Sequence, residues 1–265
     1  MNSLTTRLAG IRANRRKGLV AFLTAGFPTP AVFGDLVRAA ADSGCDLVEI
    51  GIPFSDPIAD GPVVQAASTV ALAQGMTLAR ALEATAFLSR QVGVPIVFMS
   101  YLNPMLSFGA ARFARWSARA GVSGVIIPDV PFEESDELRA SMRQSGLAYI
   151  DLVAPTSSDE RIQAIARSAE GFVYLVSLTG VTGAREATAA GLPELIGRVR
   201  AAMRPPVYVG FGVSSAEQAR DIARDADGVI IGSRLLQLAA DGEAAGAAHR
   251  VGAFLAGVRR ALDTG

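Results

Sequence analysis

Eight short apolar runs alternate with helical patterns along the chain, and this alternation limits the folds that the chain can adopt. Strands that read as continuous apolar runs are buried on both faces, as in a parallel sheet. Their alternation with helices is typical of βαβ units, in which each helix leads from one parallel strand to the next. The predicted strands lie at residues 19–24, 47–51, 95–100, 124–128, 148–153, 172–177, 206–210 and 228–232.

The number of these units favours a closed barrel over an open doubly wound sheet. A chain of 265 residues is close to the size of one (β/α)₈ TIM barrel, and no linker or composition shift divides it. We therefore predict an α/β fold with a single barrel domain over residues 1–265. Helices are predicted at residues 30–43, 63–73, 77–91, 108–120, 133–145, 158–168, 193–203, 215–224, 233–240 and 244–262, which places extra short helices after strands two and eight. The spacing of Leu4, Leu8 and Ile11 predicts an N-terminal helix that caps one end of the barrel.

The charge balance and hydropathy exclude several classes of partner. The formal net charge is zero, which argues against a nucleic-acid partner, because such partners usually require a basic face. No segment is long and apolar enough to predict a membrane span, and the basic N-terminus lacks the apolar core of a signal peptide. The single cysteine, Cys45, rules out an internal disulfide and favours a reducing, cytoplasmic location.

The scarce residue types exclude several kinds of chemistry. The chain has one lysine (Lys17), one histidine (His249) and one cysteine (Cys45). Lys17 and Cys45 directly precede strands, so both belong to the end of the barrel opposite the active site, and His249 lies in the terminal helix. A Schiff-base lysine, a histidine base, a cysteine nucleophile and a histidine-rich metal site are all poorly supplied, so no metal is expected. The chemistry must depend on carboxylates, hydroxyl groups, arginines and backbone amides.

The second strand and the loop after it carry the best candidates for catalysis. Glu49 interrupts an otherwise apolar strand, where an unpaired carboxylate is costly, and desolvation raises its pKa towards the range useful for acid–base work. The proline-rich loop that follows adds Asp56 and Asp60. Each acid also has a structural interpretation: Glu49 as a buried ion pair, Asp60 as a helix cap and Asp56 as part of a turn. The spacing alone favours neither interpretation of Asp60.

Glycine-rich loops after strands six, seven and eight predict a phosphate site. The glycines include Gly183, Gly212 and Gly232, the last followed by Ser233. Glycine allows the backbone to approach an anion, and the loops after strands seven and eight are the common phosphate cradle of this fold. Any one of these loops could simply form a tight turn, but three in the expected places favour phosphate binding. Tyr174 could be core or ligand contact, and Asp129 could be a loop acid or a partner contact.

Several motifs together resemble the tryptophan synthase alpha chain family. The segment FSDPIADGP from Phe54 to Pro62, preceded by EIGIP from Glu49, is similar to the signature of that family. PDVP at 128–131 resembles its fourth βα loop, SLTGVTGA at 177–184 its sixth loop, and Gly212 and Gly232 its phosphate site. The resemblance covers about residues 4–262 in order. It implies a carbon–carbon lyase that cleaves indole-3-glycerol phosphate to indole and glyceraldehyde 3-phosphate, in the last steps of tryptophan biosynthesis.

The resemblance also implies roles for individual residues. Glu49 matches the general acid/base, and Asp60 matches the acid that binds the indole N–H and stabilises the positive charge developing there. Tyr174 and Thr182 match supporting residues, the latter closing the sixth loop onto Asp60. The remaining matches are an indole pocket at Phe22, Tyr101, Leu152 and Phe211, a phosphate site at Gly183, Gly212, Gly232 and Ser233, and a partner surface at Asp56, Pro57, Asp129 and Pro131.

A partner follows from the same resemblance. The family works with a beta chain that carries pyridoxal phosphate and receives indole through a tunnel, in an alpha2beta2 heterotetramer, so no cofactor is expected in this chain. Two alternatives remain open. The chain could be another phosphate-sugar barrel isomerase or lyase that uses Glu49 alone, or a non-catalytic activator of a beta chain. The presence of both Glu49 and Asp60 disfavours the second alternative.

Overall fold

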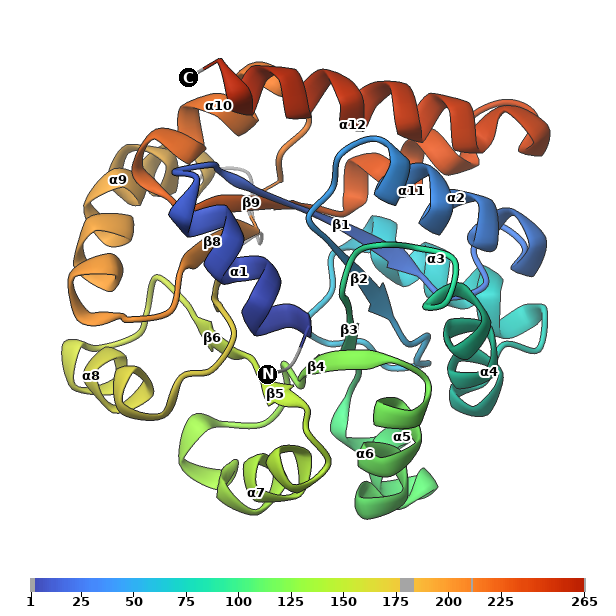
Figure 1. The fold of residues 1–265 in the computed structure, drawn as a ribbon, viewed down its shortest axis with the longest axis horizontal. Coiled ribbons are helices and arrows are strands. Elements are labelled where there is room, and N and C mark those ends of the chain that lie inside the picture. The colour runs from blue at the N-terminus through green and yellow to red at the C-terminus, as the bar shows by residue number, and fades with distance from the viewer. Residues whose placement is uncertain (1–2, 177–183, 211, 265) are drawn as a thin grey trace.

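A computed structural model describes residues 3–176, 184–210 and 212–264. Parallel strands form one sheet in the order β5-β4-β3-β2-β1-β9-β8-β7-β6. These strands are β1 (Gly18–Thr24), β2 (Leu47–Gly51), β3 (Ile96–Met99), β4 (Val122–Ile126), β5 (Ala148–Tyr149), β6 (Asp151–Val153), β7 (Val173–Val176), β8 (Val207–Gly210) and β9 (Gly228–Ile231). The two edge strands of this order, β5 and β6, follow one another in the chain, so the two edges of the sheet meet. The sheet therefore curls into a nearly closed barrel, as Figure 1 shows.

The predicted fifth strand is divided in two at Ile150. Before it, β5 pairs with β4, and after it, β6 pairs with β7. The Ile150 N–H still donates to the Val125 carbonyl at 2.9 Å, and its side chain is fully buried. The chain therefore leaves one neighbouring strand and joins the other within a single residue, which closes the barrel. The predicted (β/α)₈ barrel is confirmed, with its fifth strand split between two ladders.

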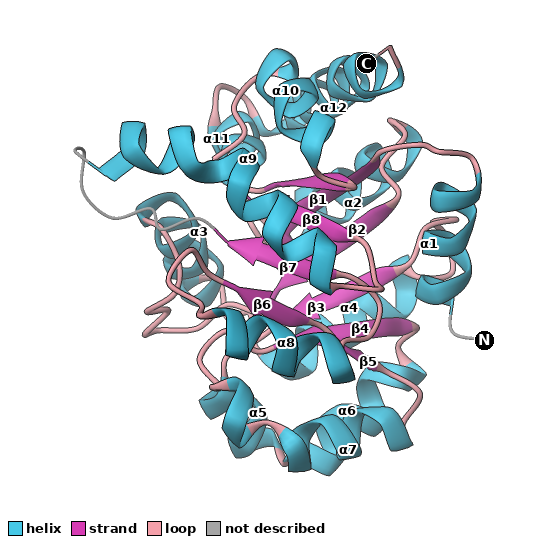
Figure 2. Ribbon diagram, turned by 90° about the vertical axis from the view of Figure 1, so that its left-hand side faces the viewer, coloured by secondary structure: helices cyan, strands magenta, loops and turns pink. Residues whose placement is uncertain are grey.

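Helices surround the strands, as Figures 1 and 2 show. They are α1 (Ser3–Ala13), α2 (Pro30–Asp42), α3 (Pro62–Ala73), α4 (Leu78–Leu88), α5 (Leu102–Phe108), α6 (Ala110–Arg119), α7 (Asp136–Gln144), α8 (Asp159–Ser168), α9 (Ala184–Ala202), α10 (Ala216–Asp225), α11 (Ser233–Ala240) and α12 (Ala247–Asp263), with short 3₁₀ turns η1 (Phe132–Glu134) and η2 (Ala244–Gly246). Two helices follow strand β2, and α11 with α12 follow β9, as predicted.

Two helix predictions were wrong. A separate helix, α5, precedes α6 after strand β3, although a single helix was predicted there. The Leu102 N–H at its start donates to both Asp129 oxygens, at 3.0 and 3.1 Å, so the cap comes from a different loop and leaves no local signal. Helix α9 begins at Ala184, nine residues before the predicted start at 193, and includes Pro193 in its interior. Proline is typical of a helix start, which is why the pattern placed the boundary too late.

Helix α1 covers the end of the barrel where the strands begin. Leu4, Leu8 and Ile11 are buried, and the Leu4 side chain lies against Gly124 and Gly171. Figure 2 shows α1 at one end of the strands and α3 at the opposite end. The predicted capping helix is therefore confirmed.

The buried Asp46 connects several segments of the chain at this end of the barrel. It forms ion pairs with Arg16 and Arg259 at 2.5 and 3.4 Å, and it accepts the Leu19 N–H at 3.0 Å. Cys45 beside it is buried, so both residues contribute to structure at the end away from the loops that follow the strands.

Candidate active site

Glu49 is the most unusual polar residue of the barrel interior. It lies in β2, is fully buried, and neither carboxylate oxygen has a hydrogen-bond partner among the described residues. Burial, followed by the nearby charge of Asp60, raises the pKa of Glu49 from 4.5 to about 8. Such a carboxyl is largely protonated at neutral pH, so it can donate a proton and, after donation, accept one.

Asp60 lies near Glu49 but in a different environment. The loop between β2 and α3 carries it, and its N–H donates to the Pro57 carbonyl at 3.0 Å. Burial raises the pKa of Asp60 from 3.8 to about 6, and a hydrogen bond with the Tyr101 side chain opposes that rise. Asp60 is therefore mostly ionised at neutral pH. One buried acid and one carboxylate thus occur together in one site.

Tyr101 fixes the loop that carries Asp60. Its side chain is buried and its hydroxyl accepts the Ala59 N–H at 3.0 Å. The Phe54 ring packs against the Tyr101 ring with centroids 5.4 Å apart. The sequence predicted Tyr101 as part of an apolar pocket, and its anchoring of the loop was not foreseen. The contact joins residues 42 positions apart, so no local pattern could indicate it.

The predicted pocket residues Phe22 and Leu152 and the predicted supporting residue Tyr174 come from strands that line the same interior. Phe22 is the register partner of Glu49, and Leu152 is the partner of Tyr174, so each pair points to one face of the sheet. Burial, then the charges of Glu49 and Asp60, raises the pKa of Tyr174 well above its usual value, so the phenol lies within electrostatic reach of both acids.

Glycines leave the space that these aromatic rings occupy. A Cβ at Gly51 would lie 2.6 Å from the Phe22 ring, and one at Gly210 would overlap the Tyr174 ring. A Cβ at Gly232 would approach Phe22 to 3.1 Å. Any side chain at Gly51 or Gly210 would displace a ring that borders the acids. The mouth of the barrel therefore depends on glycine for its shape as well as for any anion contact.

Thr24 is a neighbour that the sequence did not single out. It is the register partner of Gly51, is buried, and its hydroxyl has no hydrogen-bond partner among the described residues. A threonine in a strand is ordinary, so no sequence signal could have identified it.

The predicted phosphate residues that the structure describes are Gly212, Gly232 and Ser233. Ser233 begins α11, whose N-cap is Gly232, and no side chain caps that helix. Its free N–H groups can bind an anion, which the helix dipole also favours. Gly212 has a φ of +43°, a backbone conformation that favours glycine. No atom lies within 4 Å of the place that a Cβ would occupy, so crowding by neighbours is not the reason for glycine here. Thr182, Gly183 and Phe211 lie outside the described residues.

The predicted partner residues lie at the surface near the same loops. Asp56 is exposed and accepts a hydrogen bond from the Ser55 hydroxyl, and Pro131 is also exposed. Ile58, between Asp56 and Asp60, is 83% exposed, which is unusual for a large apolar side chain. Asp129 is half-buried because it caps α5, so this residue has a structural contact of its own.

These features define an enzyme of the parallel (β/α)₈ barrel class. Two acids of different pKa lie at the end of the barrel where the strands end, next to loops that contain glycine. The described residues hold no group of three or more potential metal ligands, and none of the helices among them is long and apolar enough to cross a membrane.

Comparisons with known proteins narrow the class to one family. A family model described as tryptophan synthase alpha chain matches residues 8–260. The tryptophan synthase alpha chain of Laribacter hongkongensis is 49% identical over 266 residues, covering 99% of this chain and 100% of that protein. A solved alpha subunit from Legionella pneumophila is 36% identical with a TM-score of 0.90, covering 100% and 99% of the two chains. A tryptophan synthase structure from Mycobacterium tuberculosis is 38% identical, also with a TM-score of 0.90 and the same coverage.

The chain therefore belongs to the tryptophan synthase alpha chain family. It is an enzyme, a lyase of tryptophan biosynthesis, and it catalyses the alpha reaction, the cleavage of indole-3-glycerol phosphate. The family implies a beta-chain partner in general.

Proposed function

We propose that Glu49 and Asp60 divide the chemistry of this cleavage between them. The observation that carries the proposal is the difference between their pKa values, about 8 for Glu49 and about 6 for Asp60. At neutral pH the first is mainly a neutral acid and the second mainly a carboxylate. Two titratable groups whose environments separate their pKa values are the usual basis for assigning acid and base roles.

In the proposed reaction, the Glu49 carboxyl first protonates C3 of the indole ring and gives an indolenine cation. The Asp60 carboxylate accepts a hydrogen bond from the ring N–H and stabilises the positive charge on nitrogen. The ionised Glu49 then takes the proton of the hydroxyl on the adjacent glycerol carbon. The C–C bond breaks, its electron pair restores the indole, and the glycerol carbon becomes the aldehyde. The proton returned to Glu49 balances the one it gave.

Both described acids have the environment that these roles require. A neutral carboxyl tolerates the dry interior at Glu49, which provides no hydrogen-bond donor among the described residues. Asp60 remains ionised more readily because it is less buried and because Tyr101 donates to it. Tyr174 borders both acids, and we assign it, with Thr182, a supporting role.

The remaining residues would hold the two ends of the substrate. We assign the indole ring to the pocket formed by Phe22, Tyr101, Leu152 and Phe211, and the phosphate to Gly183, Gly212, Gly232 and Ser233. The uncapped N-terminus of α11 supports the phosphate assignment, because its N–H groups have no competing side-chain acceptor. Holding the substrate at both ends keeps C3 in reach of Glu49.

We further propose a cytoplasmic alpha2beta2 assembly in which the beta chain carries the pyridoxal phosphate and this chain carries no cofactor. The beta chain would contact Asp56, Pro57, Asp129 and Pro131. The exposed Ile58 supports this choice of surface, because it is a large apolar side chain within the catalytic loop that a partner could cover.

Cleavage in deuterium oxide tests the proton transfer. If Glu49 delivers a solvent-exchanged proton to C3, the indole released in a single turnover carries deuterium at C3. Glu49→Gln should release no labelled indole, whereas residual product from Asp60→Asn should still be labelled at C3. Release of C3-labelled indole by Glu49→Gln at the wild-type rate would remove Glu49 from the proton transfer.

A further inference from the structure

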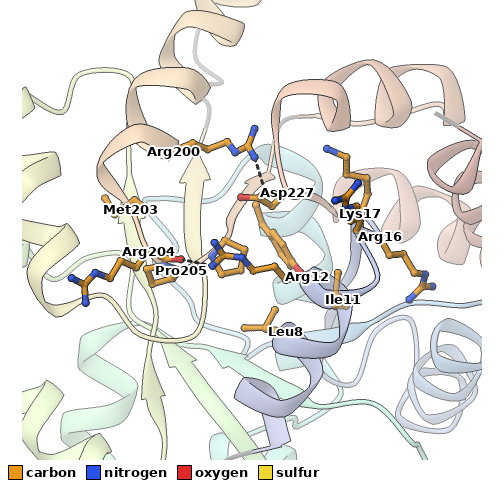
Figure 3. Close-up of a pocket in the computed structure, with 13 residues that line it drawn as sticks. Leu8, Ile11, Arg12, Arg16, Lys17, Arg200, Met203, Arg204, Pro205 and Asp227 are labelled. Carbon is orange, nitrogen blue, oxygen red and sulfur yellow. Dashed lines mark hydrogen bonds and ion pairs between the residues drawn. The ribbon is translucent and has the colours of Figure 1, made fainter.

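A strongly basic cavity lies at the end of the barrel opposite the active site. It has a volume of about 340 Å³. The C-terminal part of α1, the segment leading into β1, the end of α9 and the segment leading into β8 line it, as Figure 3 shows. We call it the basal cavity. No step of the proposed reaction uses this cavity. The proposed reaction takes place at the other end of the barrel, where β8 ends at Gly210 and β9 ends just before Gly232.

The charges around the basal cavity are unbalanced. Its lining includes six basic side chains, Arg12, Arg15, Arg16, Lys17, Arg200 and Arg204, and one acid, Asp227. Two of the basic groups have carboxylate partners: Arg16 pairs with Asp46 at 2.5 Å and Arg200 with Asp227 at 3.1 Å. The other four form no ion pair with any described residue. The chain as a whole has no net charge, so this excess is local.

Lys17 and Arg12 are already held in place by the backbone. The Lys17 ammonium donates to the Ala226 carbonyl at 2.8 Å, and the Arg12 guanidinium donates to the Arg204 carbonyl at 3.2 Å. In Figure 3, Arg12 and Lys17 lie on the side of the cavity formed by α1 and the segment after it, facing Arg200 and Arg204. Burial lowers the pKa of Lys17, a cost that a bound anion would offset by favouring the charged ammonium. Partly ordered cations lose less freedom when they bind an anion.

Arg15 is held in a backbone conformation that favours glycine. Its φ is +51°, and it is the one non-glycine with a positive φ among the described residues. It ends α1 with the Arg16 N–H donating to the Ile11 carbonyl at 3.0 Å, an arrangement in which glycine is the usual residue. An arginine here strains the backbone without any ion pair among the described residues to compensate.

Tyr208 belongs to the same lining and has an unused hydroxyl. The side chain is 1% exposed, and its hydroxyl has no hydrogen-bond partner among the described residues. A buried hydroxyl without a partner is costly, but this one is closed off from the cavity, so we do not count it among the ligands of the site.

We propose that the basal cavity is a second anion site that binds a small phosphate-bearing molecule, with Arg12, Arg15 and Lys17 as its cationic ligands. Arginine and lysine are the side chains that proteins use most for phosphate. The cavity volume falls at the lower end of the range for small-molecule sites, and the chain has no net positive charge of the kind that favours a nucleic acid. A small ligand is therefore favoured over a polyanion.

Calorimetric titration with pyrophosphate at low ionic strength tests the site. The full chain would carry Gly212→Asp, so that a carboxylate opposes anions at the active-site phosphate position. We expect one pyrophosphate per chain, bound about tenfold or more weakly after Arg12→Gln, which removes a charged hydrogen-bond donor. Arg115→Gln, at an exposed arginine of α6, is the matched control and should bind as tightly as its parent.

Arg15→Gly separates binding from folding. Because glycine suits the positive φ, this variant should melt at a higher temperature than its parent while binding pyrophosphate more weakly. Titrations with inorganic phosphate, AMP and adenosine show whether the phosphate alone or a nucleotide is preferred, and adenosine should not bind.

Three results would overturn the proposal. They are an absence of saturable pyrophosphate binding, equal binding after Arg12→Gln, and tighter binding of single-stranded DNA or anionic vesicles than of any small phosphate at this site.

Discussion

Replacing Glu49 by glutamine should abolish cleavage and, at the same time, stabilise the protein. The side chain keeps its shape but can no longer donate or accept a proton. General acid–base catalysis by one group contributes about 10²–10⁴-fold, and here the same group acts in both steps of the proposed reaction. We therefore expect the rate of indole release to fall by about 10⁴-fold or more.

The gain in stability follows from the raised pKa. In the unfolded chain Glu49 titrates near 4.5, and in the folded protein near 8. Between these values the folded state binds more protons than the unfolded state, so the free energy of unfolding falls as pH rises. At pH 7, which is about 2.5 units above the ordinary pKa of Glu49, the raised pKa lowers the free energy of unfolding. The loss is on the order of 3 kcal/mol, at about 1.4 kcal/mol per unit. Glutamine does not titrate and avoids this cost.

Urea denaturation of both proteins from pH 4 to pH 8 measures the effect. The two free energies of unfolding should be similar near pH 4 and diverge in favour of Glu49→Gln as pH rises. Glu83→Gln, at an exposed glutamate of α4, should show no such divergence. A constant difference across the pH range would show that Glu49 has no raised pKa, and wild-type turnover in Glu49→Gln would remove it from the mechanism.

The other predictions concern the second acid and the phosphate. The turnover rate should rise with pH as Asp60 ionises, with a midpoint of about 6, and fall as Glu49 ionises, with a midpoint of about 8; a flat pH–rate profile would contradict the two-acid scheme. Tyr101→Phe removes a hydrogen bond that lowers the pKa of Asp60, so the acidic limb should move to higher pH, whereas Tyr149→Phe in β5 should leave it in place. Gly212→Asp should raise the KM for indole-3-glycerol phosphate about tenfold or more relative to the neutral Gly212→Asn. Aspartate and asparagine both tolerate a positive φ, but only aspartate repels the phosphate. Equal KM values for the two variants would exclude Gly212 from the phosphate site.

Most of the fold could be predicted from the sequence because hydrophobic periodicity is a local property. The strands are continuous apolar runs, and the number of alternating units favours a closed barrel. The errors occurred where a distant contact determines local structure. Helix α5 begins because Asp129, 27 residues away, accepts the N–H of Leu102. The break at Ile150 depends on which neighbouring strand each half of the fifth strand can reach.

The candidate site was predictable in part for a similar reason. An acid within an apolar strand is visible in the sequence, so the local pattern alone identifies Glu49 as unusual. Asp60 could not be separated from a helix cap by spacing alone. Its assignment as an acid of the site rests on its proximity to Glu49 and Tyr101, which only the folded chain brings together. Thr24 carries no sequence signal at all, because its only distinction is a hydroxyl buried without a partner among the described residues.

The contacts of Tyr101 and Leu102 give a physical route by which a partner could influence catalysis. The Tyr101 hydroxyl holds the loop that carries Asp60, and the next residue, Leu102, holds Asp129 through its backbone N–H. A beta chain that displaces the loop containing Asp129 must therefore either break the contact with Leu102 or move it. Moving Leu102 also moves Tyr101, on which both the position and the pKa of Asp60 depend. The loop after β2 and the loop after β4 are thus linked by two adjacent residues, so a change at the exposed surface can reach the Asp60 carboxylate without any larger rearrangement of the barrel.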